Sequence, residues 1–260
     1  MIPYELIIPS ASRPHLLRET LSTLLANVDQ PPSRIIVHED VRDPSSADIR
    51  PTIESSLGGT IPFVLGVDSP PIRHGAALHW LYRTARTDFV LYSQDDFAVV
   101  RPLPVRACLA AMAEHGLHHV RFNKRDTMGE KNGWKKRDVA FGDVTLTLCD
   151  AWYFQTSLCR RARMLAVLDW FSRMRPRTLW EHPEPKLNQA FNGQLPDFNA
   201  ANVIDTPPPD RYLDQDVRQV VQRTFIFGPI GERQYIEHLG WRIADWRTER
   251  SNRTGGIDGP

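Results

Sequence analysis

Two adjacent carboxylates follow a short apolar run of strand-forming residues. The run covers residues 89–92, and Ser93 and Gln94 separate it from Asp95 and Asp96. A buried strand of a parallel sheet has such a run, and ligands of open α/β sheets bind where strands end. Adjacent carboxylates repel one another, so the pair needs solvent, basic side chains or a divalent cation. Two interpretations stay open: a solvated turn, or a site for Mg²⁺ or Mn²⁺ carrying a diphosphate.

The residues at the start of the chain predict a βαβ unit. Residues 5–8 favour a strand, and residues 14–27 place leucines at helical spacing. A second strand over 34–38 then ends at two further acids, residues 39–40. Strand, helix and strand in this order form a βαβ unit. Its ligand edge is expected to carry residues 9–13 and the second acidic pair.

Three further elements lead to the acidic strand. Residues 48–57 favour a short helix, and residues 61–66 a third strand. Pro62 predicts that this strand is short or near an edge of the sheet. A helix over 73–86 then delivers the chain to residues 89–92. Three strands are therefore expected to converge at one edge.

Four motifs follow one another along residues 1–100. They are a strand ending in Ile-Pro-Ser with Arg-Pro just beyond, a strand ending in two acids, a Gly-Ala-Ala helix and a strand into Asp-Asp. This order resembles the nucleotide-sugar half of GT-A type glycosyltransferases, most closely the family 2-like group. That family usually has Asp-x-Asp or Asp-Asp-Asp after the last strand, whereas Gln94 replaces the first acid here.

The resemblance implies the fold and its division. The expected fold is α/β of the GT-A (Rossmann-like) type, with a mixed, mostly parallel sheet, helices on both faces, and a single domain with a C-terminal extension. Residues 1–100 would form the nucleotide-sugar-binding half, and residues 101–250 the acceptor-binding and catalytic half. Residues 251–260 are Gly-rich and are expected to be a disordered tail.

The resemblance also implies a metal and a donor site. Asp96 would bind Mn²⁺ or Mg²⁺ directly. His238, in a late His-Leu-Gly, would supply a neutral nitrogen ligand, although a lone histidine is more often structural. Arg13 and Arg73 could pair with phosphates. The residues expected to contact a nucleotide-sugar donor, most simply a UDP-sugar, are Pro9, Ser10, Arg13, Glu39, Asp40, Arg73 and Asp95.

Two acids lie at the mouth of a later helix, Glu181 and Glu184. The helix dipole stabilises an acid at this place and holds it rigidly, which suits a general base. Capping of the helix is the alternative role. In inverting members of the family, an acid here deprotonates the acceptor hydroxyl. The resemblance thus implies inversion, with Glu181 or Glu184 as the base.

A basic segment over 121–137 contains Trp134 and Lys135. A solvated loop is the default interpretation, but basic side chains beside an aromatic also suit a nucleic-acid strand. Trp152 would flank the sugar by resemblance, although a Trp-Tyr-Phe run is more often core. The single acceptor favoured is a hydroxymethylated pyrimidine in phage DNA. A saccharide, a protein or a small molecule is the alternative.

Composition indicates the class of protein and the cellular compartment to expect. The 260 residues are 41% hydrophobic and 24% charged, as in ordinary soluble globular proteins. A net charge of +1 gives no overall attraction to nucleic acid or membrane. We expect no signal peptide and no membrane-spanning segment. Three cysteines without metal-ligand spacing fit a reducing compartment. A cytoplasmic protein follows, in the host cytoplasm if it is viral.

Two other classes of protein stay open. A nucleotidyltransferase would usually have a Gly-rich phosphate loop with a lysine near the first strand, and residues 9–14 contain neither. A non-catalytic sugar- or nucleic-acid-binding module could keep the fold and lose its acids. Asp95, Asp96 and His238 are present, as are both candidate bases. Transfer of a sugar is therefore the function that the sequence favours.

Overall fold

The computed structural model describes residues 1–41, 48–69, 72–124, 127, 130–131, 134–135, 137–149, 155–175, 177, 183–191 and 224–239. The strands of its large sheet are β1 (Tyr4–Ser10), β2 (Arg34–Asp40), β3 (Phe63–Asp68), β4 (Phe89–Tyr92), β6 (His119–Arg121), β9 (Arg137–Phe141), β10 (Val144–Cys149), β11 (Ser157–Arg160) and β12 (Thr224–Phe227). The helices are α1 (Pro14–Asn27), α2 (Arg50–Leu57), α3 (Arg73–Thr84), α4 (Val105–His115), α5 (Arg161–Met174) and α7 (Pro183–Phe191).

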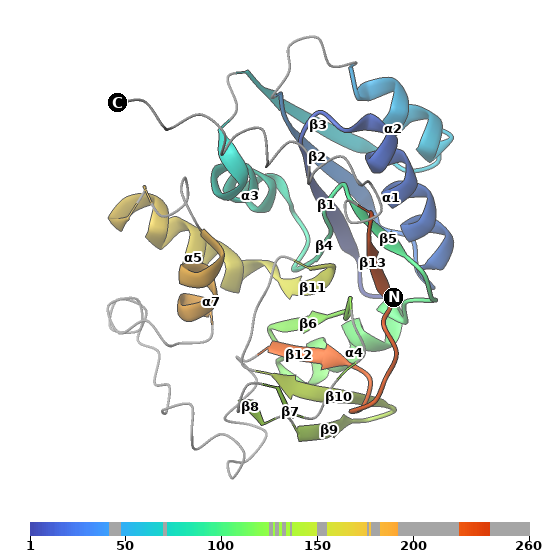
Figure 1. Ribbon diagram of the computed structural model, residues 1–260, viewed down its shortest axis with the longest axis vertical. Coiled ribbons are helices and arrows are strands. Elements are labelled where there is room, and N and C mark those ends of the chain that lie inside the picture. Colours follow the sequence, from blue (N-terminus) through green and yellow to red (C-terminus); the bar gives the residue numbers. More distant parts are fainter. Residues whose placement is uncertain are drawn as a thin grey trace, which may run out of the picture.

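The large sheet is mixed and mostly parallel (Figure 1). In the described residues the strand order is β3-β2-β1-β4-β11-β6-β12-β10-β9. The four strands from β3 to β4 are parallel neighbours. Only β11 and β10 run against the other strands of this sheet. The carboxyl ends of β1, β2 and β4 therefore meet at one edge, and β3 lies at the margin that Pro62 predicts.

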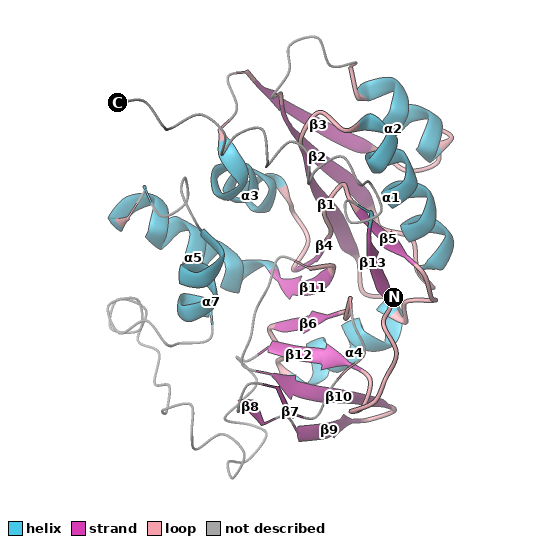
Figure 2. Cartoon of the chain, in the orientation of Figure 1, coloured by secondary structure: helices cyan, strands magenta, loops and turns pink. Residues whose placement is uncertain are grey.

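Helices cover both faces of the sheet (Figure 2). Side chains alternate along a strand, and β1 shows this directly. Leu6 and Ile8 pack in one hydrophobic core with α1, α2 and α4. Ile7, between them, packs in a second core with α3, α5 and α7. The expected α/β class and its two covered faces are thus confirmed.

Two small sheets lie outside the large one. Strands β5 (Phe97–Val99) and β13 (Ile236–His238) pair antiparallel. Strands β7 (Glu130–Lys131) and β8 (Trp134–Lys135) also pair antiparallel. The β5–β13 pair joins the segment after the acidic residues to the last described strand. The β7–β8 pair lies within the basic segment over 121–137.

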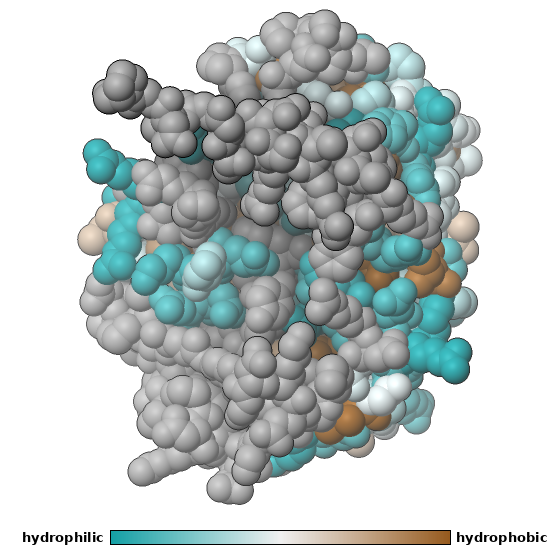
Figure 3. Space-filling model, viewed as in Figure 1, coloured by the Kyte–Doolittle hydropathy of each residue, from teal (hydrophilic) through white to brown (hydrophobic). Residues whose placement is uncertain are grey.

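On the face in Figure 3, the described residues are mostly hydrophilic. The most exposed large hydrophobic side chains in the described residues are scattered over different elements: Met1, Val67, Val100, Met174 and Ile230. Single exposed hydrophobics of this kind are normal in folded proteins. Within the described ranges, no helix has the length and apolar character to cross a membrane.

Two histidines lie where β6 meets α5 and α7. The ring of His119 packs against Phe191 of α7, with centroids 5.3 Å apart. Burial lowers the pKa of His119 well below its usual value, and Arg121 adds to this effect. Burial also lowers the pKa of His118 to about 4. Both rings therefore stay neutral in the folded chain over a pH range in which unfolded histidine takes up a proton.

Acid is expected to destabilise the fold through these two rings. Their folded-state pKa values are depressed, so the stability they contribute is complete above pH 6.5 and is lost as the pH falls below it, down to about 4 for His118. Each pH unit in that window costs about 1.4 kcal/mol per histidine. His119→Leu should flatten the dependence on pH of the free energy of unfolding, measured in urea. His15→Leu, at an exposed site on α1, is the matched control. An unchanged slope in His119→Leu would contradict the assignment.

Candidate functional site

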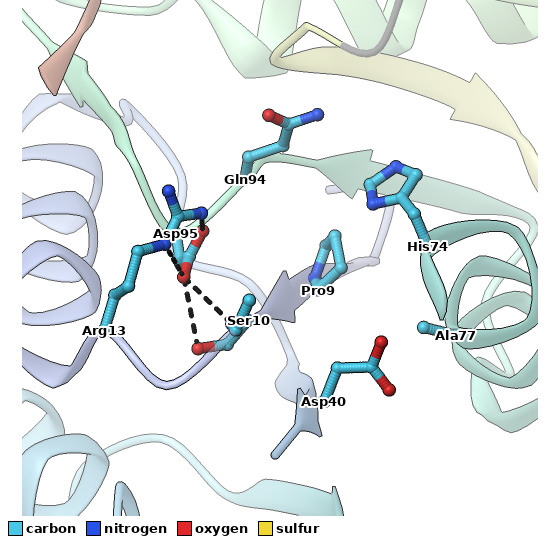
Figure 4. Close-up of a pocket in the computed structure, with 9 residues that line it drawn as sticks. Pro9, Ser10, Arg13, Asp40, His74, Ala77, Gln94 and Asp95 are labelled. Carbon is cyan, nitrogen blue, oxygen red and sulfur yellow. Dashed lines mark hydrogen bonds and ion pairs between the residues drawn. The ribbon is translucent and has the colours of Figure 1, made fainter. Parts of the chain in front are cut away.

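A pocket lies at the edge where β1, β2 and β4 end (Figure 4). The register places Ser10 beside Glu39 and Ile7 beside Tyr92. The empty space, including its open mouth, is about 390 Å³. Its lining residues are Pro9, Ser10, Ala11, Arg13, Asp40, His74, Ala77, Gln94 and Asp95. Five of the residues expected to contact the donor thus surround one pocket.

Arg13 supplies the cation that the two adjacent carboxylates require. Its Nε donates to Asp95 Oδ2 at 3.1 Å, its Nη2 pairs with Asp95 Oδ1, and its Nη1 donates to Asp96 Oδ2 at 2.9 Å. The Asp95 carboxylate also accepts from Ser10 Oγ at 3.3 Å and from the Ala11 amide at 3.1 Å. Figure 4 shows Arg13, Ser10 and Asp95 together on one side of the pocket.

Asp95 and Asp96 are almost inaccessible to solvent, at 1% and 5% exposure. Burial raises the pKa of Asp95 to about 6, and the charge of Asp96 adds to this effect. Arg13 and the Ala11 amide act in the opposite direction. Two acids this close and this buried are stable only because a cation bridges them. Arg13 is therefore a structural partner of the pair as well as part of the pocket wall.

The structure brings His238 to Asp96 from the far end of the chain. His238 pairs with Phe97 in the β13–β5 ladder, and the Leu239 amide donates to the Asp96 carbonyl at 2.8 Å. His238 Nε2 lies 3.6 Å from Asp96 Oδ2. Burial lowers the pKa of His238, although Asp96 opposes the shift. A neutral imidazole beside a carboxylate has the chemistry of a metal-ligand pair.

The donor set fits a metal ion that arrives with a diphosphate. Asp96 Oδ1 is buried and has no hydrogen-bond partner within the described part of the chain. No group of three or more His, Cys, Asp or Glu side chains suited to a metal occurs in those residues. Mg²⁺ is commonly held by one or two carboxylates together with substrate phosphates and water. Asp96 and His238 could supply the protein side of such a site, with phosphate oxygens completing it.

Glu39 and Asp40 hold the two loops that border the pocket. Glu39 Oε1 accepts from the Ser12 amide at 2.5 Å. Asp40 accepts from the amides of Ile72 and Arg73, at 2.8 and 2.9 Å, where α3 begins. Ser12 and Arg73 have positive φ angles of 55° and 69°, which cost about 1–3 kcal/mol for non-glycine residues. The carboxylates of Glu39 and Asp40 therefore stabilise the strained backbone of Ser12 and Arg73 through hydrogen bonds.

Glu39 also has an oxygen suited to a ligand. Its Oε2 is buried without a hydrogen-bond partner among the described residues. An unsatisfied buried acceptor costs free energy that a donor group on a ligand would recover. Arg73, by contrast, is exposed and does not line the pocket, although its helix begins beside it.

Four pocket residues were not predicted as site residues, and two of them, His74 and Gln94, are polar. Gln94 Nε2 donates to the Tyr92 hydroxyl at 3.0 Å, and that hydroxyl lies 3.4 Å from His74 Nε2. Burial raises the pKa of Tyr92 well above its usual value, so the hydroxyl keeps its proton. In Figure 4 both side chains lie across the pocket from Asp40. The signal that could have found His74 is its place in the first turn of a helix that starts at the ligand edge.

Helix α7 places Glu184 on the same side of the molecule as Tyr92. Glu184 is in the first turn of α7, and its negative charge contributes to the raised pKa of Tyr92. The carboxylate therefore lies within electrostatic range of Tyr92, whose hydroxyl contacts the pocket residues His74 and Gln94. The other end of α7 is anchored because Arg163 Nη2 donates to the Phe191 carbonyl at 2.8 Å. The helix thus holds Glu184 on a fixed support.

The remaining predicted site residues are not placed. Glu181 and Trp152 lie outside the described residues. Trp134 and Lys135 form β8, and their side chains are not described. The choice between Glu181 and Glu184, and the acceptor-binding roles, stay predictions.

No protein-family model matches this sequence, and none of the curated proteins searched matches it. Among solved structures, the chain is similar to residues 1–349 of S. aureus TarS in complex with UDP-GlcNAc, with a TM-score of 0.48 and 15% identity over 91% of this chain and 58% of that one. It is also similar to the mannosyltransferase PcManGT from Pyrobaculum calidifontis in complex with GDP-Man and Mn²⁺, with a TM-score of 0.46 and 14% identity over 85% and 68%. The chain spans 58% of the TarS chain that it matches.

Proposed function

We propose that this protein is a glycosyltransferase, which moves a sugar from a nucleotide-sugar donor to an acceptor hydroxyl. The observation that carries the proposal is the meeting of Asp95, Asp96 and His238 with Arg13 beside a pocket at the ends of parallel strands. The resemblance of the strand-end motifs to the nucleotide-sugar half of GT-A type enzymes supports the same reaction.

The donor is proposed to be a UDP-sugar bound along the edge from β2 to β4. Glu39 and Asp40 would contact the base and ribose, since Glu39 keeps a buried acceptor oxygen without a partner in the described residues. Ser10 and Pro9 would form the floor of the pocket, and Asp95 would lie by the ribose or the water shell of the metal. Arg13 and Arg73 would pair with phosphate oxygens.

Asp96 and His238 would hold Mn²⁺ or Mg²⁺ together with the diphosphate. When bound there, the ion would supply a Lewis acid beside the charge that builds on the leaving diphosphate. Arg13 would add a second positive charge on the same side of the donor. Because the two acids are buried, these charges lie in surroundings of low dielectric constant, where electrostatic interactions are stronger than in water.

Glu184 is the proposed general base, and Glu181 is the alternative. The base takes the proton of the acceptor hydroxyl, and the oxygen attacks the anomeric carbon. The bond from that carbon to the diphosphate oxygen breaks, and its electron pair leaves on the diphosphate. One in-line displacement from the opposite face inverts the anomeric centre. No second carboxylate nucleophile is required.

The acceptor is proposed to be a hydroxymethylated pyrimidine in phage DNA. Support comes from the basic segment over 121–137, whose described part includes the antiparallel strands β7 and β8, the latter formed by Trp134 and Lys135. Trp152 is the proposed aromatic beside the sugar. A saccharide, a protein or a small molecule is the alternative acceptor. We place the protein in the cytoplasm, in keeping with the buried thiols of Cys108, Cys149 and Cys159, none of which forms a disulfide within the described residues.

A thermal-shift panel of nucleotides and nucleotide sugars, with and without Mn²⁺, tests the donor site. A ligand that binds only the folded state raises its melting temperature. At a concentration about a hundredfold above Kd, we expect UDP with Mn²⁺ to raise the melting temperature by roughly 5 °C or more. ATP serves as the unmatched nucleotide. If no nucleotide shifts the melting temperature under either condition, the proposed donor site is wrong.

A further inference from the structure

Arg13 forms an ion pair with the Asp96 carboxylate, which is proposed to hold the metal. One guanidinium bridges both acids, with Nε and Nη2 on Asp95 and Nη1 on Asp96. Asp95 has other partners, the Ser10 hydroxyl and the Ala11 amide, so it remains anchored if Arg13 moves. The described contacts of the Asp96 carboxylate are instead Arg13 and His238. Asp96 is therefore the acid whose surroundings a shift of Arg13 would change most.

A guanidinium and a divalent cation on one carboxylate repel each other. A metal ion can bind Asp96 well only if Nη1 leaves or if new negative charge arrives. A diphosphate supplies that charge, and its oxygens match the planar fork of arginine. The Arg13 side chain is 37% exposed and lines the pocket, so its outer nitrogens can turn toward a ligand. Its Nε contact with Asp95 can stay in place during this turn.

We propose that Arg13 couples metal binding to diphosphate binding. Without a nucleotide, Arg13 holds Asp96 and keeps its affinity for a divalent cation low. A bound diphosphate draws Nη1 from Asp96 and so opens this ligand to the metal. Coupling of this kind is reciprocal, because each ligand must raise the affinity for the other by the same factor. The inference rests on the proposed function, since it requires a diphosphate in the pocket.

The test is the affinity for Mn²⁺ of the nucleotide-free protein, measured by titration calorimetry and by electron paramagnetic resonance of free Mn²⁺. Arg13→Met removes the guanidinium and keeps the length of the side chain. We expect this variant to bind Mn²⁺ alone about tenfold more tightly than the wild type, within the usual range of coupling factors. Arg18→Met is the matched control, because Arg18 is exposed on the same helix. It should bind Mn²⁺ as the wild type does.

A second variant and a second measurement guard against loss of the fold. Arg13→Gln is neutral, like Met, but can still donate to Asp95. In both Arg13 variants Mn²⁺ alone should raise the melting temperature, because it replaces the lost cation, whereas the wild type should respond only when UDP is also present. Unchanged or weaker binding of Mn²⁺ by folded Arg13→Met and Arg13→Gln overturns the role of Arg13.

The same titrations separate this inference from the proposed function. Titrations of the wild type with UDP and with GDP, each with and without Mn²⁺, test the donor site itself. If neither diphosphate binds under any condition, the proposed function fails, and the coupling fails with it. If a diphosphate binds and the Arg13 variants show no gain in nucleotide-free Mn²⁺ affinity, only the coupling is wrong.

Discussion

Asp96→Asn is expected to lower the rate of sugar transfer by about a hundredfold or more while the fold persists. Asparagine keeps the size of the side chain and an oxygen that can accept from Arg13 Nη1, so the surroundings of the residue stay filled. It loses the negative charge that would hold the metal beside the leaving diphosphate. Loss of one preorganised electrostatic contact of this kind typically costs a factor of about 10²–10³.

The measurement is the initial rate at which nucleoside diphosphate is released from the donor, with thermal unfolding recorded alongside. Asp143→Asn is the matched control, because Asp143 is exposed in the turn between β9 and β10. That control should keep the wild-type rate. An Asp96→Asn enzyme that is folded and keeps most of its activity would rule out the metal assignment.

Glu184→Gln is expected to lower kcat by a factor of about 10²–10⁴ and to change KM little. Glutamine preserves the shape at the start of α7 but cannot accept the proton of the acceptor hydroxyl. Steady-state kinetics with saturating donor measure this effect. Glu54→Gln, at an exposed site on α2, is the matched control.

The same kinetics on Glu181→Gln decide between the two candidate bases. Loss of kcat in Glu181→Gln alone would move the role to Glu181. If both single variants retain the wild-type kcat, a general base at this helix is contradicted. A pH profile adds a second check, because the acidic limb of kcat should vanish in the variant that has lost the base.

The first half of the fold could be predicted because local signals agree with tertiary structure there. The predicted helix over 14–27 matches α1, since leucine spacing and Pro14 give the same start. Pro62 correctly placed β3 at an edge. Parallel strands have their carboxyl ends on one side, so the meeting of Ser10, Glu39 and Asp95 at one edge could also be anticipated.

Elements that depend on distant pairing could not be read from local pattern. The local pattern of residues 158–173 favours a helix, but Ser157–Arg160 is strand β11, between β4 and β6, and α5 begins only at Arg161. Pairing on both sides outweighs the local helical preference. Strands β5 and β9 were not expected. The pairing of β5 with β13 sets His238 beside Asp96, and only the family resemblance had suggested this proximity.

The contacts within the site were only partly predictable. Charge repulsion between Asp95 and Asp96 predicts that the pair needs a cation. It does not predict that Arg13 is that cation. Glu39 and Asp40 accept hydrogen bonds from the amides of Ser12 and Arg73, which have positive φ angles. The sequence gives no sign of these contacts, because neither Ser12 nor Arg73 is a glycine. Such roles follow from the packing of loops and not from residue type.

The measurement that tests the central claim most directly is release of nucleoside diphosphate from a panel of nucleotide sugars, with Mn²⁺, with and without acceptors. The acceptors are hydroxymethylated duplex DNA, unmodified DNA and a set of saccharides. We predict that the wild type turns over one donor, preferably a UDP-sugar, that an acceptor accelerates release, and that Asp96→Asn lowers the rate of release by about a hundredfold or more. Donor binding without release under any of these conditions would contradict a glycosyltransferase and would indicate a binding module.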